Sequence, residues 1–242
     1  MSPRQHLSCF ILNDSVAIDA GSLALAVNDV QRRNVRDIVL THAHLDHIAG
    51  LPLFIDDLFA TLESPVRVYA TDEVTKILEQ NIFNWEIYPR FSELENEFGP
   101  VLEYVRIENG NEFCIGSLRF KPLAVNHKVP STGFIVTCEE SALAMSGDTS
   151  SMDEFWEHVN SNLSVKSVLL ECAFPDELAS TAERSYHMTP SMLKRELRKL
   201  RREECEIYII NIKPMYRKSV IRQLSAEGRK INILEVGRRY SF

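Results

Sequence analysis

The stretch Thr41-His42-Ala43-His44-Leu45-Asp46-His47 decides the fold of this chain, and it follows the apolar run Ile38-Val39-Leu40. Its three imidazoles suit zinc, iron or manganese, and its carboxylate adds a harder ligand that can serve a second ion. His42 and His44 are two residues apart, so on extended backbone their side chains point the same way and can bind one metal ion. The pattern predicts a metal site at the end of a strand.

Asp46 and His47 lie just beyond this pair, where we expect the chain to turn and these side chains to face a neighbouring metal ion. The alternative is a chance cluster of surface histidines. The chain has only seven histidines in 242 residues, so three of them with an aspartate in set positions favour the metal site.

The pattern His-x-His-x-Asp-His after a buried strand resembles the metallo-β-lactamase superfamily of binuclear metallohydrolases. The longer form over residues 42–51 is similar to the class II cyclic-nucleotide phosphodiesterases, with the tRNA 3′-processing endonuclease RNase Z as a close relative. The resemblance extends in pieces from about Asp19 to Lys213. It implies two divalent metal ions, which we expect to be zinc, with manganese or iron as alternatives.

Two further ligand positions appear in the order that this family has. His127 ends the segment 123–127 at a strand edge, and Asp148 lies in the segment 145–149 where a strand stops. Taken singly, each is as consistent with a structural histidine or a Gly-Asp turn. The resemblance implies that one metal ion is held by His42, His44 and His127, that the second is held by Asp46 and His47, and that Asp148 bridges the two.

The segment Ile210-Asn211-Ile-Lys-Pro214 departs from the family, whose phosphodiesterases read His-Ile-Lys-Pro and use that histidine to complete the second metal site. Asn211 stands in its place. An amide oxygen is a weaker ligand than imidazole for transition metals, although harder ions such as Mn²⁺ or Mg²⁺ accept it. Three outcomes are open: Asn211 ligates weakly, water fills the gap, or the second site stays empty.

His187, within the segment 185–189 before an expected helix, resembles the His-x-Thr element of these relatives. An imidazole with a pKa near ~6.5 can donate a proton or stabilise phosphoryl charge at neutral pH; an exposed loop histidine is the alternative. Glu171 ends a strand and can hold His187 or cap a turn. Asp19, before Ala20-Gly21, is either an acceptor for a ligand imidazole or the start of an Asx-type turn.

The composition is that of an ordinary globular protein, with 45% hydrophobic and 25% charged residues, and we expect one domain over residues 1–242. No run approaches the ~18 apolar residues of a membrane span, so we expect no membrane partner. The N-terminal residues show no signal-peptide pattern, and five single cysteines read as buried thiols, so we expect a cytoplasmic protein.

The net charge of −7 gives no sign of the basic face that an RNA-binding protein normally shows. This balance favours a small phosphodiester substrate over a nucleic acid. The basic run over residues 194–202 alternates with glutamate and is typical of a solvated helix face.

Periodicity predicts strands and helices in groups. The expected strands are residues 8–12, 15–18, 37–40, 66–70, 102–107, 118–125, 133–138, 142–145, 167–170, 206–211 and 232–236. The expected helices are residues 23–32, 51–62, 72–83, 151–159, 190–202 and 216–226, and Thr189 and Pro190 are expected at the start of the fifth. The grouping predicts two sheets with helices outside. With the motif, it fits the four-layer αββα sandwich, two mixed β-sheets flanked by helices, that the resemblance implies.

An aromatic tract over residues 81–99 has no clear period. Its rings, Trp85, Tyr88, Phe91 and Phe98, can cap a substrate pocket and stack on a base, or serve packing or a homodimer contact. Aromatic clusters more often serve packing and interfaces, and we favour that interpretation.

The resemblance implies a metal-dependent phosphodiesterase that opens a 3′,5′-cyclic nucleotide with a metal-bridging hydroxide. Asp46 orients that hydroxide and His187 assists the leaving oxygen. One alternative is an RNase Z-like endonuclease, although the basic, glycine-rich arm of those relatives is not visible in this sequence. The other is a catalytically impaired metal-binding homologue that has lost its second site at Asn211.

Overall fold

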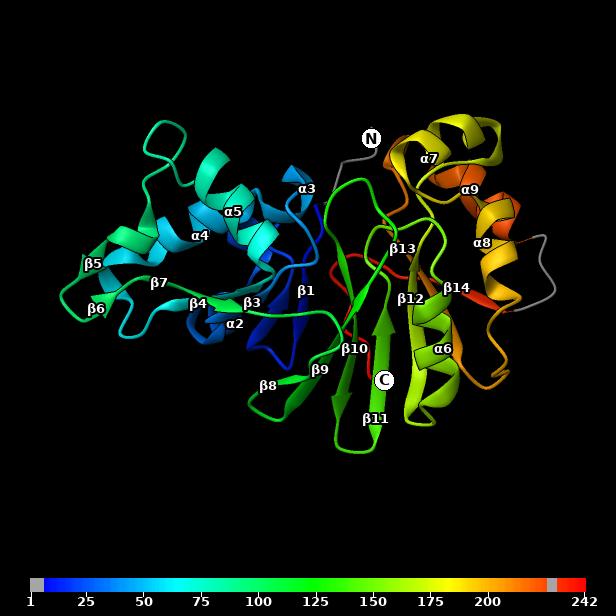
Figure 1. Cartoon of the computed structure of the whole chain (residues 1–242), viewed down its shortest axis with the longest axis horizontal. Helices are drawn as coiled ribbons and strands as arrows, with labels where there is room; N and C mark the ends of the chain where they lie inside the picture. The colour runs from blue at the N-terminus through cyan, green and yellow to red at the C-terminus, as the bar shows by residue number, and fades with distance from the viewer. Residues whose placement is uncertain (1–6, 226–229) are drawn as a thin grey trace. The chain divides into compact units, whose positions relative to one another are not determined.

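The computed structural model describes residues 7–225 and 230–242, and these residues form two compact units. The N-terminal unit comprises residues 7–108, and the C-terminal unit comprises residues 109–225 and 230–242. Figure 1 draws the first in blue to green and the second in green to red. A single domain over residues 1–242 stays a prediction.

The N-terminal unit is built on a five-stranded mixed sheet with the strand order β1-β2-β3-β4-β7. Only β1 and β2 are antiparallel, and the other neighbours are parallel. Asn13 and Asp14 join β1 to β2 with φ values of 48° and 55°, the left-handed backbone that tight hairpin turns require and that Asn and Asp tolerate. The strands are β1 Phe10–Leu12, β2 Val16–Ile18, β3 Asp37–Val39, β4 Val66–Ala70 and β7 Leu102–Arg106.

The helices of this unit are short, and all except α2 bury residues. They are α1 Leu23–Ala26, α2 Asp29–Asn34, α3 Leu45–Ile48, α4 Gly50–Leu58 and α5 Asp72–Asn81, with a 3₁₀ turn at Phe59–Thr61 and another at Phe91–Glu93. The prediction of one helix over residues 23–32 is wrong, because α1 ends at Ala26 and α2 begins anew after its N-cap Asn28. The Asn28 side chain accepts from the backbone of Val30 and Gln31 and forms a capping box. The small ribbon of β5 Glu95–Asn96 and β6 Gly99–Pro100 was not predicted.

The C-terminal unit is built on a seven-stranded mixed sheet with the strand order β14-β13-β12-β11-β10-β9-β8. Strands β8 to β11 form an antiparallel meander, and β11 to β14 are parallel neighbours. It follows that β9, β11, β12 and β13 all run in the same direction and end at the same edge. The strands are β8 Phe113–Ile115, β9 Leu118–Ala124, β10 Thr132–Cys138, β11 Ser141–Met145, β12 Val165–Glu171, β13 Glu206–Ile210 and β14 Ile231–Ile233.

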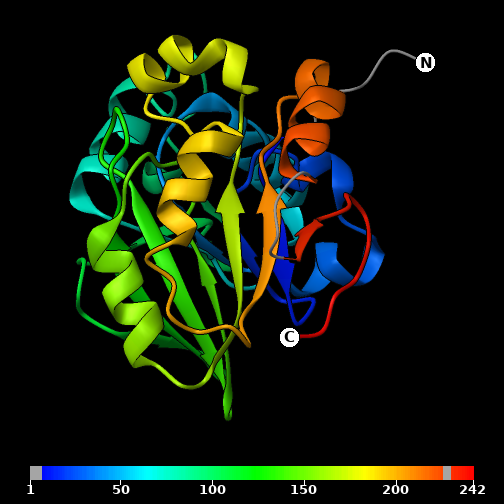
Figure 2. The same ribbon diagram turned by 90° about the vertical axis from the view of Figure 1, so that its right-hand side faces the viewer.

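Four helices accompany this sheet, namely α6 Asp153–Ser161, α7 Ala179–Ser185, α8 Pro190–Leu197 and α9 Arg217–Leu224, with 3₁₀ turns at Asp176–Leu178 and Pro214–Tyr216. Figure 2 shows α6 and α8 side by side on one face. Alternate strand residues such as Leu170 and Ile209 pack there against Trp156, Leu193 and Val220 in one buried cluster. Neither β8 nor α7 was predicted, and the expected helix over residues 216–226 ends at Ala226, outside the described residues.

Both sheets are mixed and both carry helices, which confirms the α/β class. Thr189 caps α8 and Pro190 begins it, as predicted. Among the helices of residues 7–225 and 230–242, none combines the length and apolar character that a membrane span requires.

Candidate functional site

The first group of predicted site residues lies at the carboxyl ends of β2 and β3. These strands are parallel neighbours, so the residues that follow them meet at one edge of the sheet. Asp19 follows β2, and Thr41 and His42 follow β3 after Leu40. The backbone N–H of Asp19 donates to the carbonyl of Val39 at 2.9 Å, which joins the two loops directly.

Asp19 is buried and accepts hydrogen bonds on both carboxylate oxygens. Thr41 donates from its backbone nitrogen and its hydroxyl to Oδ1, both at 2.9 Å, and the Ser8 hydroxyl donates to Oδ2 at 3.0 Å. His47 Nδ1 lies 2.6 Å from Oδ2. Because an ionised carboxylate can only accept, Nδ1 of His47 carries the proton, and Nε2 carries the lone pair that a metal ion can use. Asp19 therefore acts as an acceptor for a motif imidazole.

Thr41 fixes which ring nitrogen of His42 carries the proton, a role that sequence reasoning missed. The single hydroxyl proton of Thr41 is committed to Asp19, so Oγ1 accepts from Nδ1 of His42, 3.0 Å away. The lone pair of His42 is then on Nε2, and this nitrogen lies 3.1 Å from Nδ1 of His44. Two nitrogens around a tetrahedral zinc lie about 3.3 Å apart, given Zn–N bonds of 2.0–2.1 Å. His42 and His44 project the same way, as predicted, and converge at a spacing that fits one ion.

The motif also begins a helix, which sequence reasoning missed. His44 is extended, with φ −67° and ψ 147°, and α3 starts at the next residue, so that Asp46 lies in its first turn and His47 is buried. Gly21 permits this placement, because a Cβ at that position would lie 2.0 Å from the carbonyl oxygen of Asp46. The sequence signal for this close approach was the glycine two residues after Asp19.

The second group lies at one edge of the seven-stranded sheet. His127 follows β9, Asp148 follows β11, Glu171 ends β12 and Asn211 follows β13, and these four strands run in the same direction. His187 follows α7 and joins them. One ligand atom from each of His127, Asp148 and His187 lies within 4.8 Å of the others, a spacing that fits a shared metal ion.

Glu171 holds His187, and it does so from a fully buried position. Its Oε1 lies 2.9 Å from Nδ1 of His187 and accepts from the backbone of Thr149, also at 2.9 Å. Burial raises the pKa of Glu171. Burial also opposes protonation of His187, but its hydrogen bond to Glu171 and the charges of Glu171 and Asp148 outweigh this and raise its pKa above 6.5. His187 is thus suited to carry a proton near neutral pH.

His127 is oriented by a residue that carries no sequence signal. Nδ1 of His127 lies 3.1 Å from the carbonyl oxygen of Tyr186, which can only accept, so the lone pair of His127 is on Nε2. Tyr186 ends α7 in the left-handed conformation, with φ 57°. No local pattern predicts a tyrosine there, because left-handed backbone favours Gly, Asn and Asp.

Asn211 contacts Asp148 directly. It has φ 55°, a backbone conformation that asparagine tolerates, and its side-chain amide donates a hydrogen bond to Asp148 Oδ1. Whether Asn211 ligates the second metal ion, leaves the gap to water or leaves the site empty therefore depends on whether it keeps this bond when metal is present.

The donor sets fit divalent metal ions. Each unit gathers imidazole nitrogens and a carboxylate, and His42, His47 and His127 each have Nδ1 held by an oxygen, the arrangement that metal-ligating histidines almost always show. The two groups lie in different units.

A family model described as the beta-lactamase superfamily domain matches residues 16–205. A Yersinia pestis protein named as a probable 3′,5′-cyclic-nucleotide phosphodiesterase is 24% identical over 208 residues, which are 76% of this chain and 59% of that protein. The 3′,5′-cyclic-nucleotide phosphodiesterase 1 of Saccharomyces cerevisiae is 26% identical over 192 residues, 69% of this chain and 51% of that protein. The chain thus spans between half and three fifths of these relatives.

A third relative, the chloroplastic tRNase Z TRZ2 of Arabidopsis thaliana, is 27% identical over 103 residues, 41% of this chain and 26% of that protein. Among solved structures, the metallo-beta-lactamase fold protein YhfI of Bacillus subtilis matches with a TM-score of 0.76 at 15% identity, covering 97% of this chain and 91% of that one. This last likeness shows the fold.

Proposed function

We propose that this chain, which belongs to the beta-lactamase superfamily, is a metal-dependent phosphodiesterase that hydrolyses a 3′,5′-cyclic nucleotide. Hydrolase chemistry and divalent metal binding are properties of the family. The observation that carries the proposal is the pair of histidine groups: neighbouring oxygens hold Nδ1 of His42, His47 and His127, so that Nε2 of each ring carries the lone pair. The names of two relatives support the cyclic nucleotide as substrate.

The ligand assignment is part of the proposal and follows the resemblance. We assign His42, His44 and His127 to one metal ion, Asp46 and His47 to the second, and Asp148 to both, with Asn211 beside the second. Zinc is the expected metal, because imidazole is the main donor. Divalent ions bound there supply Lewis acidity, which polarises the phosphodiester and lowers the pKa of the attacking water.

The side chains of the protein then move the protons. Asp46 accepts a proton from the attacking water as its oxygen bonds to phosphorus. The bond from phosphorus to the leaving ribose oxygen breaks, and His187 gives that oxygen its proton. Glu171 keeps His187 protonated and oriented, because it raises the pKa of the imidazole and fixes Nδ1.

Two other functions make different predictions. An RNase Z-like endonuclease is favoured by the tRNase Z relative, but the net charge of −7 does not favour a long RNA. An impaired metal-binding homologue is favoured by the contact between Asn211 and Asp148, which ties up the carboxylate that the second metal needs.

The deciding experiment measures turnover and metal content of the same preparation. Protein loaded with Zn²⁺ or Mn²⁺ is expected to open cyclic AMP and to cleave bis(p-nitrophenyl) phosphate, and a chelator is expected to stop both reactions. His187→Ala is expected to lower kcat by about 10²–10⁴, whereas His158→Ala, a half-exposed histidine on α6, is the matched control and leaves it unchanged. Absence of turnover with two metals bound contradicts the proposal, and cleavage of precursor tRNA in place of cyclic AMP supports the endonuclease.

A further inference from the structure

The helices that follow the histidine motif carry apolar residues on two faces. One stripe, Leu51, Phe54, Ile55 and Leu58, is buried in the core of the N-terminal unit. A second stripe recurs at the same helical spacing, at Leu45, Ile48, Ala49, Pro52 and Leu53. Ile48 and Pro52 are buried in the unit, but Leu45 and Leu53 are 67% and 46% exposed. A surface helix of a globular protein needs only one apolar stripe, so the two exposed leucines call for an explanation.

The second stripe forms one wall of a pocket. Ile82, Ile87 and Tyr88, from the segment that follows α5, form the opposite wall. The pocket has a volume of about 250 Å³, and the described residues that line it are all uncharged. Leu45 is 67% exposed and Ile87 is 66% exposed, so both walls present apolar surface to solvent, and a grouped apolar patch is more informative than a single exposed leucine. A concave, apolar surface of this kind marks a site for a ligand rather than for water.

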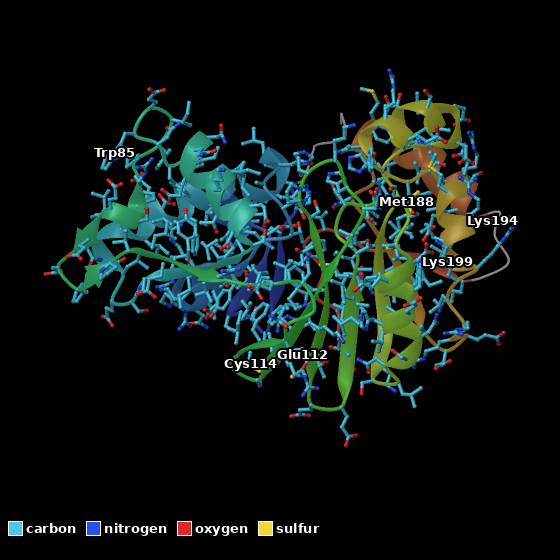
Figure 3. The ribbon with its side chains drawn as sticks, in the orientation of Figure 1. Trp85, Glu112, Cys114, Met188, Lys194 and Lys199 are labelled. Carbon is cyan, nitrogen blue, oxygen red and sulfur yellow. The ribbon has the colours of Figure 1, made fainter. Side chains whose placement is uncertain are left out.

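The segment that forms the opposite wall is held by its own hydrogen bonds. Asn84 Oδ1 accepts from the backbone of Glu86 and Ile87 at 3.0 and 2.8 Å, and the backbone N–H of Trp85 donates to the carbonyl of Tyr88 at 3.0 Å. Phe83 anchors the segment in the core, where it is fully buried. Figure 3 labels Trp85, which marks this loop beyond α5. The wall is therefore preformed, which lowers the entropic cost of binding.

The chemistry of the pocket selects its occupant. Its walls offer apolar surface and the ring of Tyr88, which suits an aromatic ring system and not a phosphate or another charged group. Leu45 stands between His44 and Asp46 in the chain, about 3.8 Å in Cα distance from each. The pocket thus starts within the motif that is assigned to the reacting phosphate.

We propose that this pocket binds the aromatic base of the cyclic nucleotide, and this inference rests on the proposed function. The packing interpretation of the aromatic tract holds for Phe91, which is 1% exposed in the core. Tyr88 also packs against Phe91, and it lines the pocket as well. A second copy of the chain is the competing occupant. The concave, ring-sized shape favours the base, because an interface between two copies needs a broader surface of ~800 Å² on each.

The test compares two substrates that share the reacting group, cyclic AMP and a base-free methyl riboside 3′,5′-cyclic phosphate. Wild-type protein is expected to prefer cyclic AMP by about tenfold or more in kcat/KM, through a lower KM. Leu53→Asn and Ile87→Asn, both on the exposed part of the pocket, are expected to remove about tenfold from the value for cyclic AMP and to leave the base-free ester unchanged. Leu25→Asn, an 87% exposed leucine of α1, is the matched control and changes neither.

Two results overturn the inference while the proposed function stands: equal kcat/KM of the wild type for both esters, or an equal loss for both esters in the pocket variants. An equal loss that accompanies a change from dimer to monomer in light scattering identifies the pocket as an interface between copies. Adenosine titrated into metal-free protein, followed by NMR, separates the two proposals. If no ester is hydrolysed, adenosine-induced shifts at Ile82 and Tyr88 that are lost in Leu53→Asn and Ile87→Asn support the pocket, and the absence of such shifts in the wild type overturns it.

Discussion

Asp19→Asn changes one atom at the centre of the N-terminal histidine group, and it is expected to move the proton on His47. Asn tolerates the left-handed backbone of this position, where φ is 58°, and its oxygen can still accept from Thr41. Its amide nitrogen, however, is a donor facing Nδ1 of His47, where the carboxylate accepted at 2.6 Å. Nδ1 must then become the acceptor, and the proton moves to Nε2, the nitrogen assigned to the metal.

The contacts that Asp19→Asn removes set the expected changes in stability and in zinc affinity. A charge-assisted hydrogen bond is replaced by a neutral one, which lowers the free energy of unfolding of the metal-free protein by about 1–2 kcal/mol. Misplacing the proton on one ligand lowers zinc affinity by about 10–100-fold, the usual effect of losing such a partner. Asp19→Ala is expected to cost more than about 3 kcal/mol, because it leaves the buried donors of Thr41, Ser8 and His47 without an acceptor and places alanine at a positive φ.

Three measurements on Asp19→Asn decide the matter: ¹⁵N shifts of the His47 ring in metal-free protein, zinc affinity by chelator competition, and urea denaturation. Asp14→Asn is the matched control, since Asp14 also has a positive φ of 55° but lies in the hairpin turn, where it accepts from Gln31. A folded Asp19→Asn variant in which His47 keeps its proton on Nδ1 and zinc affinity is unchanged contradicts this expectation.

Three further predictions concern the C-terminal unit. Glu171→Gln is expected to lower the pKa of His187. A raised histidine pKa stabilises the folded state below about pH 6.5, and this stability is lost as pH rises through the raised value, so the stability advantage of wild type over Glu171→Gln should shrink from about pH 6.5 upward. An NMR titration of metal-free protein that shows the same His187 pKa in both contradicts this expectation. Asn211→His is expected to raise the affinity for the second equivalent of zinc by about tenfold or more, as measured by elemental analysis, whereas Asn211→Ala should leave it unraised. Histidine at the positive φ of 55° is expected to lower the free energy of unfolding by about 1 kcal/mol. Thr189→Ala removes the side-chain cap of α8 and is expected to cost about 1 kcal/mol in urea denaturation, with Thr189→Ser close to wild type; equal midpoints for all three proteins would show that the cap contributes nothing.

Local patterns in the sequence predicted the elements and the motif because the physics behind them is local. The apolar run before His42 predicted β3, and the two-residue spacing of His42 and His44 predicted that their side chains converge. Thr189 and Pro190 predicted the start of α8, because a cap depends on residues three apart. Sequence reasoning failed where two local signals compete: Asn28 divides the helix that periodicity made continuous over residues 23–32.

The aromatic tract over residues 81–99 shows a second limit of prediction from the sequence. Its composition cannot tell a buried ring from an exposed one, and the structure divides its members: Phe91 is in the core, Tyr88 lines the pocket, and Trp85 is 56% exposed. Burial is a property of the neighbours that the fold brings in, and an aperiodic segment gives no face to assign.

The sequence by itself thus determined the histidine motif, the family it resembles and the strand ends that carry polar residues. Only the tertiary structure decided the partners: Asp19 with His47, Glu171 with His187, Asn211 with Asp148, and the carbonyl of Tyr186 with His127. The last two pairs are separated by 63 and 59 residues in the chain. Which parallel strands become neighbours, and hence which strand ends meet, depends on how the whole sheet buries its apolar faces, and no local spacing encodes that choice.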